Sequence, residues 1–233
     1  MIHIVVDLEM NPVEKFRRRN KPKTLSEEII EIGAVKLNDA FEKISEYQSY
    51  VHPERSDIKP TITQLTKITN EKVADAEKFA EAFKNFLEWV FEKKIDYKKM
   101  NDLDFSDVLF YSWSDADIKQ IRNECYYKLE TFDTKKISAA WIDLQKEFDN
   151  RLGLHANLSL QYAIGAMNKN FEGTAHTALA DAINTADILI LMQDNDRFQQ
   201  VMSPIKNMLH REVLTTSIAD LCPELANFKV QVS

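Results

Sequence analysis

The sequence predicts an α/β layered domain built on a mixed β-sheet. An apolar run at 2–6 is rich in β-branched residues, and the pattern at 29–51 is that of two strands joined by a turn. Beyond residue 60, helical patterns alternate with further short apolar runs, which is typical of α/β domains. A hairpin pairs strands antiparallel and helical crossovers pair them parallel, so we expect both kinds of pairing.

The bulk composition narrows the class of protein. The 233 residues are 44% hydrophobic and 29% charged, as in ordinary globular proteins. No apolar run approaches the roughly 20 residues of a membrane span, and no secretory signal is visible. Cys125 and Cys222 have no metal-binding spacing, so we expect a reducing, cytoplasmic location without membrane association. The net charge of −7 argues against a generally basic surface but leaves room for a local basic patch.

The predicted strands are short and are separated by turn signals. A loop at 11–23, marked by two prolines, follows the first strand and carries six basic residues against one acid. Asn38-Asp39 supplies the turn chemistry of the hairpin. The five predicted strands are 2–6, 29–37, 44–51, 108–111 and 136–142.

The predicted helices follow from apolar residues at helical spacing. They cover 61–65, 73–91, a stretch from about 115, 143–150, 158–168, 177–193 and 197–212. Pro204 is expected to break the last of these helices. Asn157 or Ser159 is the expected N-cap of the helix at 158–168. Residues 93–106 are polar and contain several lysines, so we expect an exposed connection.

Asp7 and Glu9 follow the first strand directly. Residues i and i+2 of a strand point to the same face, so the two carboxylates are expected to project together. Like charges at that distance oppose ionisation unless a cation lies between them, and hard cations such as Mg²⁺ prefer oxygen ligands. The alternative is that the strand ends at residue 6 and both acids face water.

Asp117 is a candidate metal ligand at the junction of a strand and a helix, with Asp115 as the second choice. Functional groups gather outside such strand ends in open α/β sheets. Ser114-x-x-Asp117 also matches a capping box, which is a purely structural motif. The sequence leaves both interpretations open.

His176 and Asp181 lie at the start of the helix predicted at 177–193. Ala178 and Ala182 flank Asp181 on the helix surface, so the helix can approach the sheet closely. Alternatively, the histidine is a structural residue, and an aspartate in a first helical turn simply complements the helix dipole.

Together, Asp7, Glu9, Asp117, His176 and Asp181 resemble the DEDDh branch of the DnaQ-like 3′–5′ exonucleases, most of all its KapD/exoribonuclease-like subgroup. The family's three signatures occur here in order and in the expected structural settings. The resemblance implies an RNase H-like fold with a five-stranded mixed sheet flanked by helices. It covers roughly 1–193, which we expect to be the exonuclease domain, and leaves 194–233 as a helical extension of unknown role.

The flanking segments extend this resemblance. They are Glu28 to Val35, Trp141 to Leu144, Gly173 to His176 and Asn184 to Ala186. Two positions depart from the family pattern. Many relatives carry a second aspartate where this chain has Ala180, and the subgroup often has a basic residue where this chain has Ala175. Neither change removes a ligand, although the first can alter the groups that support the metal site.

The resemblance also implies a chemistry. It is hydrolysis of single-stranded RNA or DNA from the 3′ end to nucleoside 5′-monophosphates, with two divalent cations, Mg²⁺ or Mn²⁺. The implied ligands are Asp7, Glu9, Asp117 and Asp181, and His176 is the implied general base.

The basic loop is a candidate contact for the phosphate backbone, through Lys15, Arg17, Arg18, Arg19 and Lys21. Its alternative is a solvated loop. Phe16 and Trp113 are candidate stacking residues or core residues. Two other functions remain open: a nucleic-acid-binding module that has lost catalysis, and an unrelated α/β scaffold with the five residues scattered. The sequence identifies no protein partner.

Overall fold

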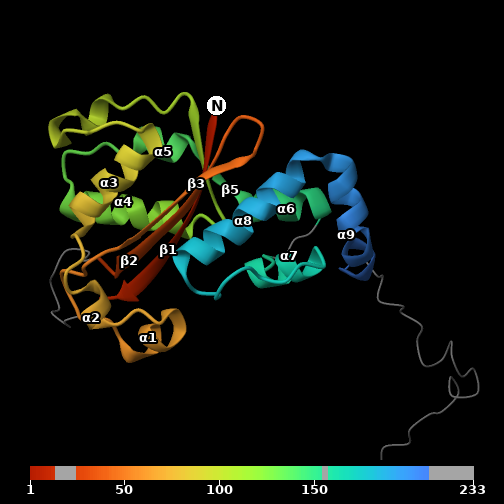
Figure 1. Ribbon diagram of the computed structural model, residues 1–233, viewed down its shortest axis with the longest axis horizontal. Helices are drawn as coiled ribbons and strands as arrows, with labels where there is room; N and C mark the ends of the chain where they lie inside the picture. Colours follow the sequence, from red (N-terminus) through yellow and green to blue (C-terminus); the bar gives the residue numbers. More distant parts are fainter. Residues whose placement is uncertain (14–24, 154–156, 210–233) are drawn as a thin grey trace, which may run out of the picture.

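The computed structural model describes residues 1–13, 25–153 and 157–209, and its centre is a five-stranded sheet in the order β3-β2-β1-β4-β5 (Figure 1). β1 pairs antiparallel with β2, and β2 with β3, whereas β1–β4 and β4–β5 are parallel pairs. The strands are β1 (Ile2–Pro12), β2 (Glu27–Leu37), β3 (Lys43–Tyr50), β4 (Val108–Ser112) and β5 (Trp141–Asp143). The predicted mixed five-stranded sheet is therefore confirmed.

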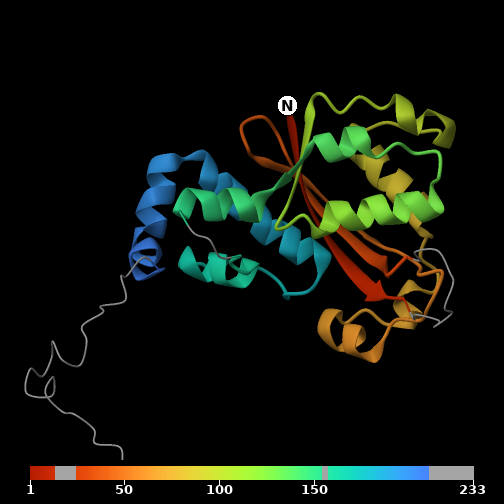
Figure 2. The ribbon, with the colours of Figure 1, turned by 180° about the vertical axis from the view of Figure 1, so that it is seen from behind.

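Helices cover both faces of the sheet, as the two opposite views show (Figures 1 and 2). Because side chains alternate along a strand, Ile4 and Val6 of β1 pack with α3 (Phe79–Phe91) and α4 (Ala116–Lys128) on one face. Val5 packs with α8 (Ala178–Gln193) on the other face. The central strands are thus buried on both sides, which explains why β1 and β2 read as nearly continuous apolar runs.

The remaining helices surround this core, and all of them except α9 are short. Ser159 accepts a hydrogen bond from the Tyr162 N–H at 3.2 Å, so it is the N-cap of α7. Phe198 of α9 is fully buried against the α8 side of the core. The helices are α1 (Pro60–Thr66), α2 (Asn70–Val73), a 3₁₀ helix (Tyr97–Asp102), α5 (Lys135–Ala139), α6 (Leu144–Leu152), α7 (Leu160–Ala166) and α9 (Asn195–Leu209).

The single helix predicted at 73–91 is wrong in its first turn and a half. α2 ends at Val73 and α3 begins only at Phe79. Between them, the Glu77 carbonyl accepts a hydrogen bond from the His52 N–H at 2.9 Å. This pairing draws the backbone into an extended bridge beside the end of β3, and that conformation is incompatible with a helix.

Three other local predictions are corrected. Residues 93–106 are not simply an exposed connection, because they contain the 3₁₀ helix and bury Ile95, Met100, Leu103 and Phe105 in the core. Most of 136–142 is the helix α5, and only three residues of β5 pair with β4. The backbone of α9 continues through Pro204 instead of breaking there. No helix in the described part of the chain is long and apolar enough to span a membrane.

Candidate active site

Asp7 and Glu9 lie on β1 and project from the face of the sheet that α8 covers. In the antiparallel register, Asp7 is opposite Gly33 and Glu9 is opposite Glu31 on β2. A Cβ atom on Gly33 would lie 2.1 Å from the backbone carbon of Ala178, so only glycine allows the start of α8 to rest there. The first turn of α8 is therefore held directly beside the two carboxylates. β1 continues to Pro12, so the alternative in which the strand ends before Asp7 is wrong.

Asp117 joins the site from the first turn of α4. β4 pairs with β1 only as far as Val5, so within the described part of the chain the later part of that β1 edge has no strand partner. The Leu8 N–H on β1 donates a hydrogen bond to Asp117 Oδ1 at 3.1 Å. The aspartate thus satisfies a buried backbone donor beyond the end of β4.

The capping-box interpretation of Ser114 and Asp117 is not supported. Ser114 Oγ accepts from the Ala116 N–H at 3.2 Å, whereas Asp117 accepts from a different element. Asp115 is half exposed and forms an ion pair with Lys119 at 2.6 Å. Of the two acids, Asp117 is therefore the one that faces the other carboxylates.

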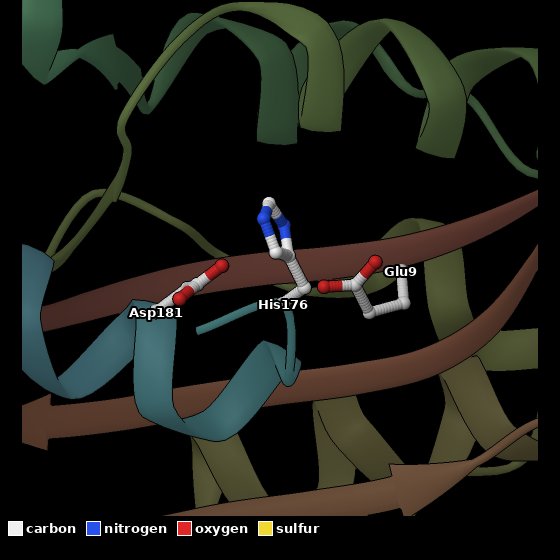
Figure 3. Close-up of side chains that lie close together, drawn as sticks. All are labelled: Glu9, His176 and Asp181. Atoms are coloured by element: carbon white, nitrogen blue, oxygen red, sulfur yellow. The ribbon is translucent and has the colours of Figure 1, made fainter. Parts of the chain in front are cut away.

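His176 and Asp181 reach the same place from α8 and the loop before it (Figure 3). Ligand-type atoms of Glu9, His176 and Asp181 all lie within 4.8 Å of one another. Figure 3 shows the imidazole standing between the two carboxylate groups. His176 has a φ of 65°, a left-handed backbone conformation that is uncommon for residues other than glycine. Such strain is often found at functional sites.

The loop that carries His176 is anchored to α8 by a buried amide. Asn184 Oδ1 accepts from the Glu172 N–H at 3.0 Å, and Asn184 Nδ2 donates to the Glu172 carbonyl at 2.9 Å. Thr177 Oγ1 donates to the Thr174 carbonyl at 2.9 Å. These bonds fix both ends of the turn that leads to the histidine.

The site concentrates negative charge away from water. Burial is the main cause that raises the pKa of Glu9 to about 8, and the charges of Asp181, Glu31 and Asp117 act in the same direction. Burial and the neighbouring acids also raise the pKa of Asp7 well above its usual range. A pKa in this range means that full ionisation is unfavourable without added positive charge.

The pKa values of the other two acids, Asp117 and Asp181, are raised as well. Burial raises the pKa of Asp117 to about 7, although hydrogen bonds from backbone N–H groups, including that of Leu8, oppose this shift. Burial raises the pKa of Asp181 to about 6, and His176 opposes it. Asp181 Oδ1 is buried and has no hydrogen-bond partner among the described residues. A buried carboxylate oxygen without a partner is well suited to a cation ligand.

The structure therefore brings together the five residues predicted from the sequence, and the scaffold alternative with these residues scattered is wrong. Glu31, Gly33 and Asn184 hold α8 and its preceding loop in place, a role that no motif in the sequence predicts for them. The only indication in the sequence is that all three lie in segments that extend the family resemblance, 28–35 and 184–186.

Trp113 is a core residue, since its Nε1 donates to the Leu158 carbonyl at 3.0 Å and its ring packs near Phe148. Outside the described residues lie Phe16 and the predicted backbone contacts Lys15, Arg17, Arg18, Arg19 and Lys21.

Known proteins share this sequence pattern and fold. The rat (Rattus norvegicus) 3′–5′ exoribonuclease 1 is 26% identical over 174 residues, which are 73% of this chain and 48% of the rat protein. The chain thus spans about half the length of the curated relatives that it matches.

Solved structures agree on the fold. The nuclease domain of 3′hExo, a DEDDh family member bound to rAMP, aligns with a TM-score of 0.66 and 24% identity, covering 83% of this chain and 92% of that domain. Escherichia coli exonuclease I with a dT13 oligonucleotide aligns with a TM-score of 0.61 and 15% identity, covering 91% of this chain and 44% of that enzyme. The RNase H-like fold expected from the resemblance is confirmed. The family model for exonucleases (RNase_T) matches residues 4–189, and the chain belongs to that family.

Proposed function

We propose that this chain is a metal-dependent 3′–5′ exonuclease that releases nucleoside 5′-monophosphates from a single-stranded nucleic acid. The observation that carries the proposal is the cluster of Glu9, His176 and Asp181 within 4.8 Å, beside the carboxylates of Asp7 and Asp117, whose charges act on Glu9 or on each other. The similarity to 3′–5′ exoribonucleases makes RNA the first substrate to test. Single-stranded DNA is the second, because exonuclease I was solved with a DNA oligonucleotide.

The carboxylates fit divalent cations. Burial raises the pKa of all four acids and so opposes their ionisation, and Asp181 Oδ1 has no hydrogen-bond partner among the described residues. Such a site fits hard, oxygen-preferring ions such as Mg²⁺ or Mn²⁺. We assign Asp7, Glu9, Asp117 and Asp181 as the groups that hold two such ions. When bound, the ions would supply charge stabilisation for the attacking and leaving oxygens of the phosphodiester.

His176 is assigned as the general base. Its ring is exposed and stands between Glu9 and Asp181, so one imidazole nitrogen can take a proton from a water molecule that attacks the phosphate (Figure 3). The nearby acids are expected to orient the ring through electrostatic attraction once it carries that proton. Hard cations prefer oxygen to nitrogen, which favours this role over that of a ligand.

The test uses matched 5′-labelled RNA and DNA oligonucleotides with Mg²⁺ or Mn²⁺. We expect a ladder that shortens from the 3′ end, slower cleavage of a 3′-phosphorylated strand, and loss of activity in EDTA or in Asp7→Ala. Full activity in chelator would exclude the metal mechanism, and cleavage of a circular single strand would exclude the exonuclease assignment. Binding without cleavage under all conditions would favour a binding module on the same fold.

A further inference from the structure

Glu31 is a fully buried acid on β2, directly opposite Glu9 in the register of the sheet. Its two oxygens have separate partners. Oε1 accepts a hydrogen bond from Gln48 Nε2 at 2.6 Å, and Oε2 accepts one from the Ala178 N–H at 3.0 Å. Both oxygens are thus already engaged by the protein, in contrast to Asp181 Oδ1. This distinguishes Glu31 from Asp181, which we assign as a metal ligand.

The Ala178 N–H is the first helical N–H group of α8, and such groups have no partner within their own helix. Thr177 occupies the N-cap position, but its side chain makes no capping hydrogen bond, since its hydroxyl donates to Thr174 instead. A carboxylate from a neighbouring strand therefore performs the capping. This links the beginning of α8 to β2 across 147 residues of sequence.

The capped turn and the residues directly before it carry two functional side chains, those of Asp181 and His176. His176 precedes Ala178 by two residues, and Asp181 follows it by three, with its N–H bonded to the Thr177 carbonyl at 3.0 Å. The glycine at position 33, two residues along β2 from Glu31, lets the same turn rest on the sheet. A shift of this turn would move His176 and Asp181 together, away from Glu9.

We propose that Glu31 is a positioning residue of the active site, whose hydrogen bond to the Ala178 N–H places His176 and Asp181 against Glu9. The inference rests on the proposed function and deepens it. Displacements of about 1 Å in a catalytic group can lower rates by about 10²-fold, so a single anchoring bond is enough to matter.

The main test compares Glu31→Gln with Glu31→Met. Glutamine keeps an oxygen that can accept from Ala178, and its amide can donate to Gln48 after the Gln48 amide turns over. Methionine has similar length but no strong acceptor. We expect Glu31→Met to lower kcat by about 10- to 100-fold with less than a threefold change in KM. Glu31→Gln is expected to stay within threefold of the unmodified protein.

Glu28→Met is the matched control. Glu28 is also fully buried on β2. It accepts hydrogen bonds from the Glu54 and Arg55 N–H groups, both at 2.9 Å, and from Lys128 Nζ at 2.8 Å, and among the described residues none of its hydrogen bonds goes to α8. We expect this variant to lose thermal stability while its kcat stays within about threefold, measured at a temperature where it remains folded. That result would separate positioning from a general weakening of β2.

Ala178→Pro removes the donor instead of the acceptor. Proline is well tolerated at the first helical position, and Thr177 has the extended conformation, φ −123° and ψ 129°, that suits a residue before proline. Both Ala178→Pro and Glu31→Met remove the hydrogen bond between Glu31 and the Ala178 N–H. If Glu31 acts through this bond, the losses of kcat in the two variants should be non-additive when they are combined. This second variant also covers the case in which Glu31→Met does not fold.

Three results would overturn the proposal: equal loss of activity in Glu31→Gln and Glu31→Met, full activity in a folded Glu31→Met, or additive effects with Ala178→Pro. Amide hydrogen exchange on the metal-free protein distinguishes this failure from failure of the proposed function. We expect the Ala178 amide to exchange faster in Glu31→Met than in Glu31→Gln, whether or not the protein cleaves nucleic acid. Equal exchange in the two variants would contradict the anchoring role even in an active enzyme.

Discussion

The Leu8 N–H donates a hydrogen bond to Asp117 Oδ1 at 3.1 Å, across 109 residues of sequence. The bond joins the middle of β1, between Asp7 and Glu9, to the first turn of α4. One oxygen of Asp117 therefore supports the backbone of the strand that carries the other acids. Asp117 thus combines a structural role with its proposed role as a ligand.

This double role predicts a difference between two substitutions at Asp117. Asp117→Asn keeps an oxygen for the Leu8 N–H and removes the charge, so we expect a folded protein whose kcat falls by at least roughly 10²-fold. Asp117→Ala also leaves a buried N–H without a partner, which costs about 1–3 kcal/mol of stability. Single-turnover kinetics and thermal unfolding of both variants provide the measurement.

The control for Asp117 is Asp115→Ala. Asp115 is exposed and pairs with Lys119 on the surface, so we expect its removal to change activity by less than about twofold. If Asp115→Ala lost as much activity as Asp117→Asn, the assignment of the ligand would have to be exchanged between the two residues.

A second prediction concerns the stability of the metal-free protein. The pKa values of Glu9, Asp117 and Asp181 are raised to about 8, 7 and 6, mainly by burial. These groups bind protons more tightly in the folded than in the unfolded protein. Their contribution to stability is therefore fully present below their unfolded pKa values of about 4 and is lost as the pH rises through 6 to 8.

We accordingly expect the melting temperature in EDTA to fall between about pH 5 and pH 8, and Mn²⁺ to restore it most strongly at the upper end. Asp7→Asn removes one of the repelling charges, so it should raise the melting temperature at pH 8 in EDTA by at least about 2 °C, the shift that roughly 1 kcal/mol gives in a domain of this size. The same variant should gain less from Mn²⁺. A melting temperature that rises with pH in EDTA would contradict this account.

His176 provides the third prediction. His176→Ala and His176→Asn both remove the proposed base, and we expect kcat to fall by about 10²–10⁴-fold in each. Mn²⁺ affinity, measured by titration, should change little because the imidazole is not assigned as a ligand. A variant that keeps more than half of the unmodified kcat in single turnovers would place the base elsewhere, and a large loss of Mn²⁺ affinity would make the histidine a ligand.

The basic loop provides the fourth prediction. If its side chains contact phosphates, reversing the charge of Arg17, Arg18 and Arg19 together should raise the KM for an oligonucleotide and flatten its salt dependence. The kcat at saturating substrate should be nearly unchanged, since these residues are not among the proposed ligands. An unchanged salt slope would indicate a solvated loop without a role in binding.

The sheet, most of the helices and the five residues of the candidate site could be predicted from the sequence alone. These follow from local patterns: β-branched runs, alternation along a strand, helical spacing, and short motifs such as Asp7-x-Glu9 and His176-x4-Asp181. Local patterns gave wrong predictions at two places. At 74–78 a helix was predicted, but the backbone pairs with residues just after β3. At 136–142 a strand was predicted, but only the three residues of β5 pair with β4.

The groups that support the site could not be predicted in this way, because their roles depend on contacts between elements that are far apart in the sequence. A capping-box motif and a metal ligand look alike at Asp117 until the chain brings Leu8 to its oxygen. In the sequence, Glu31 is one residue of a mostly apolar strand with no special pattern around it. Its role follows only from the hydrogen bond that the Ala178 N–H, far along the chain, donates to it. Spacing along the chain reports which residues share a face of one element, but contacts between elements depend on how those elements pack, and Gly33 shows how a single absent side chain permits that packing.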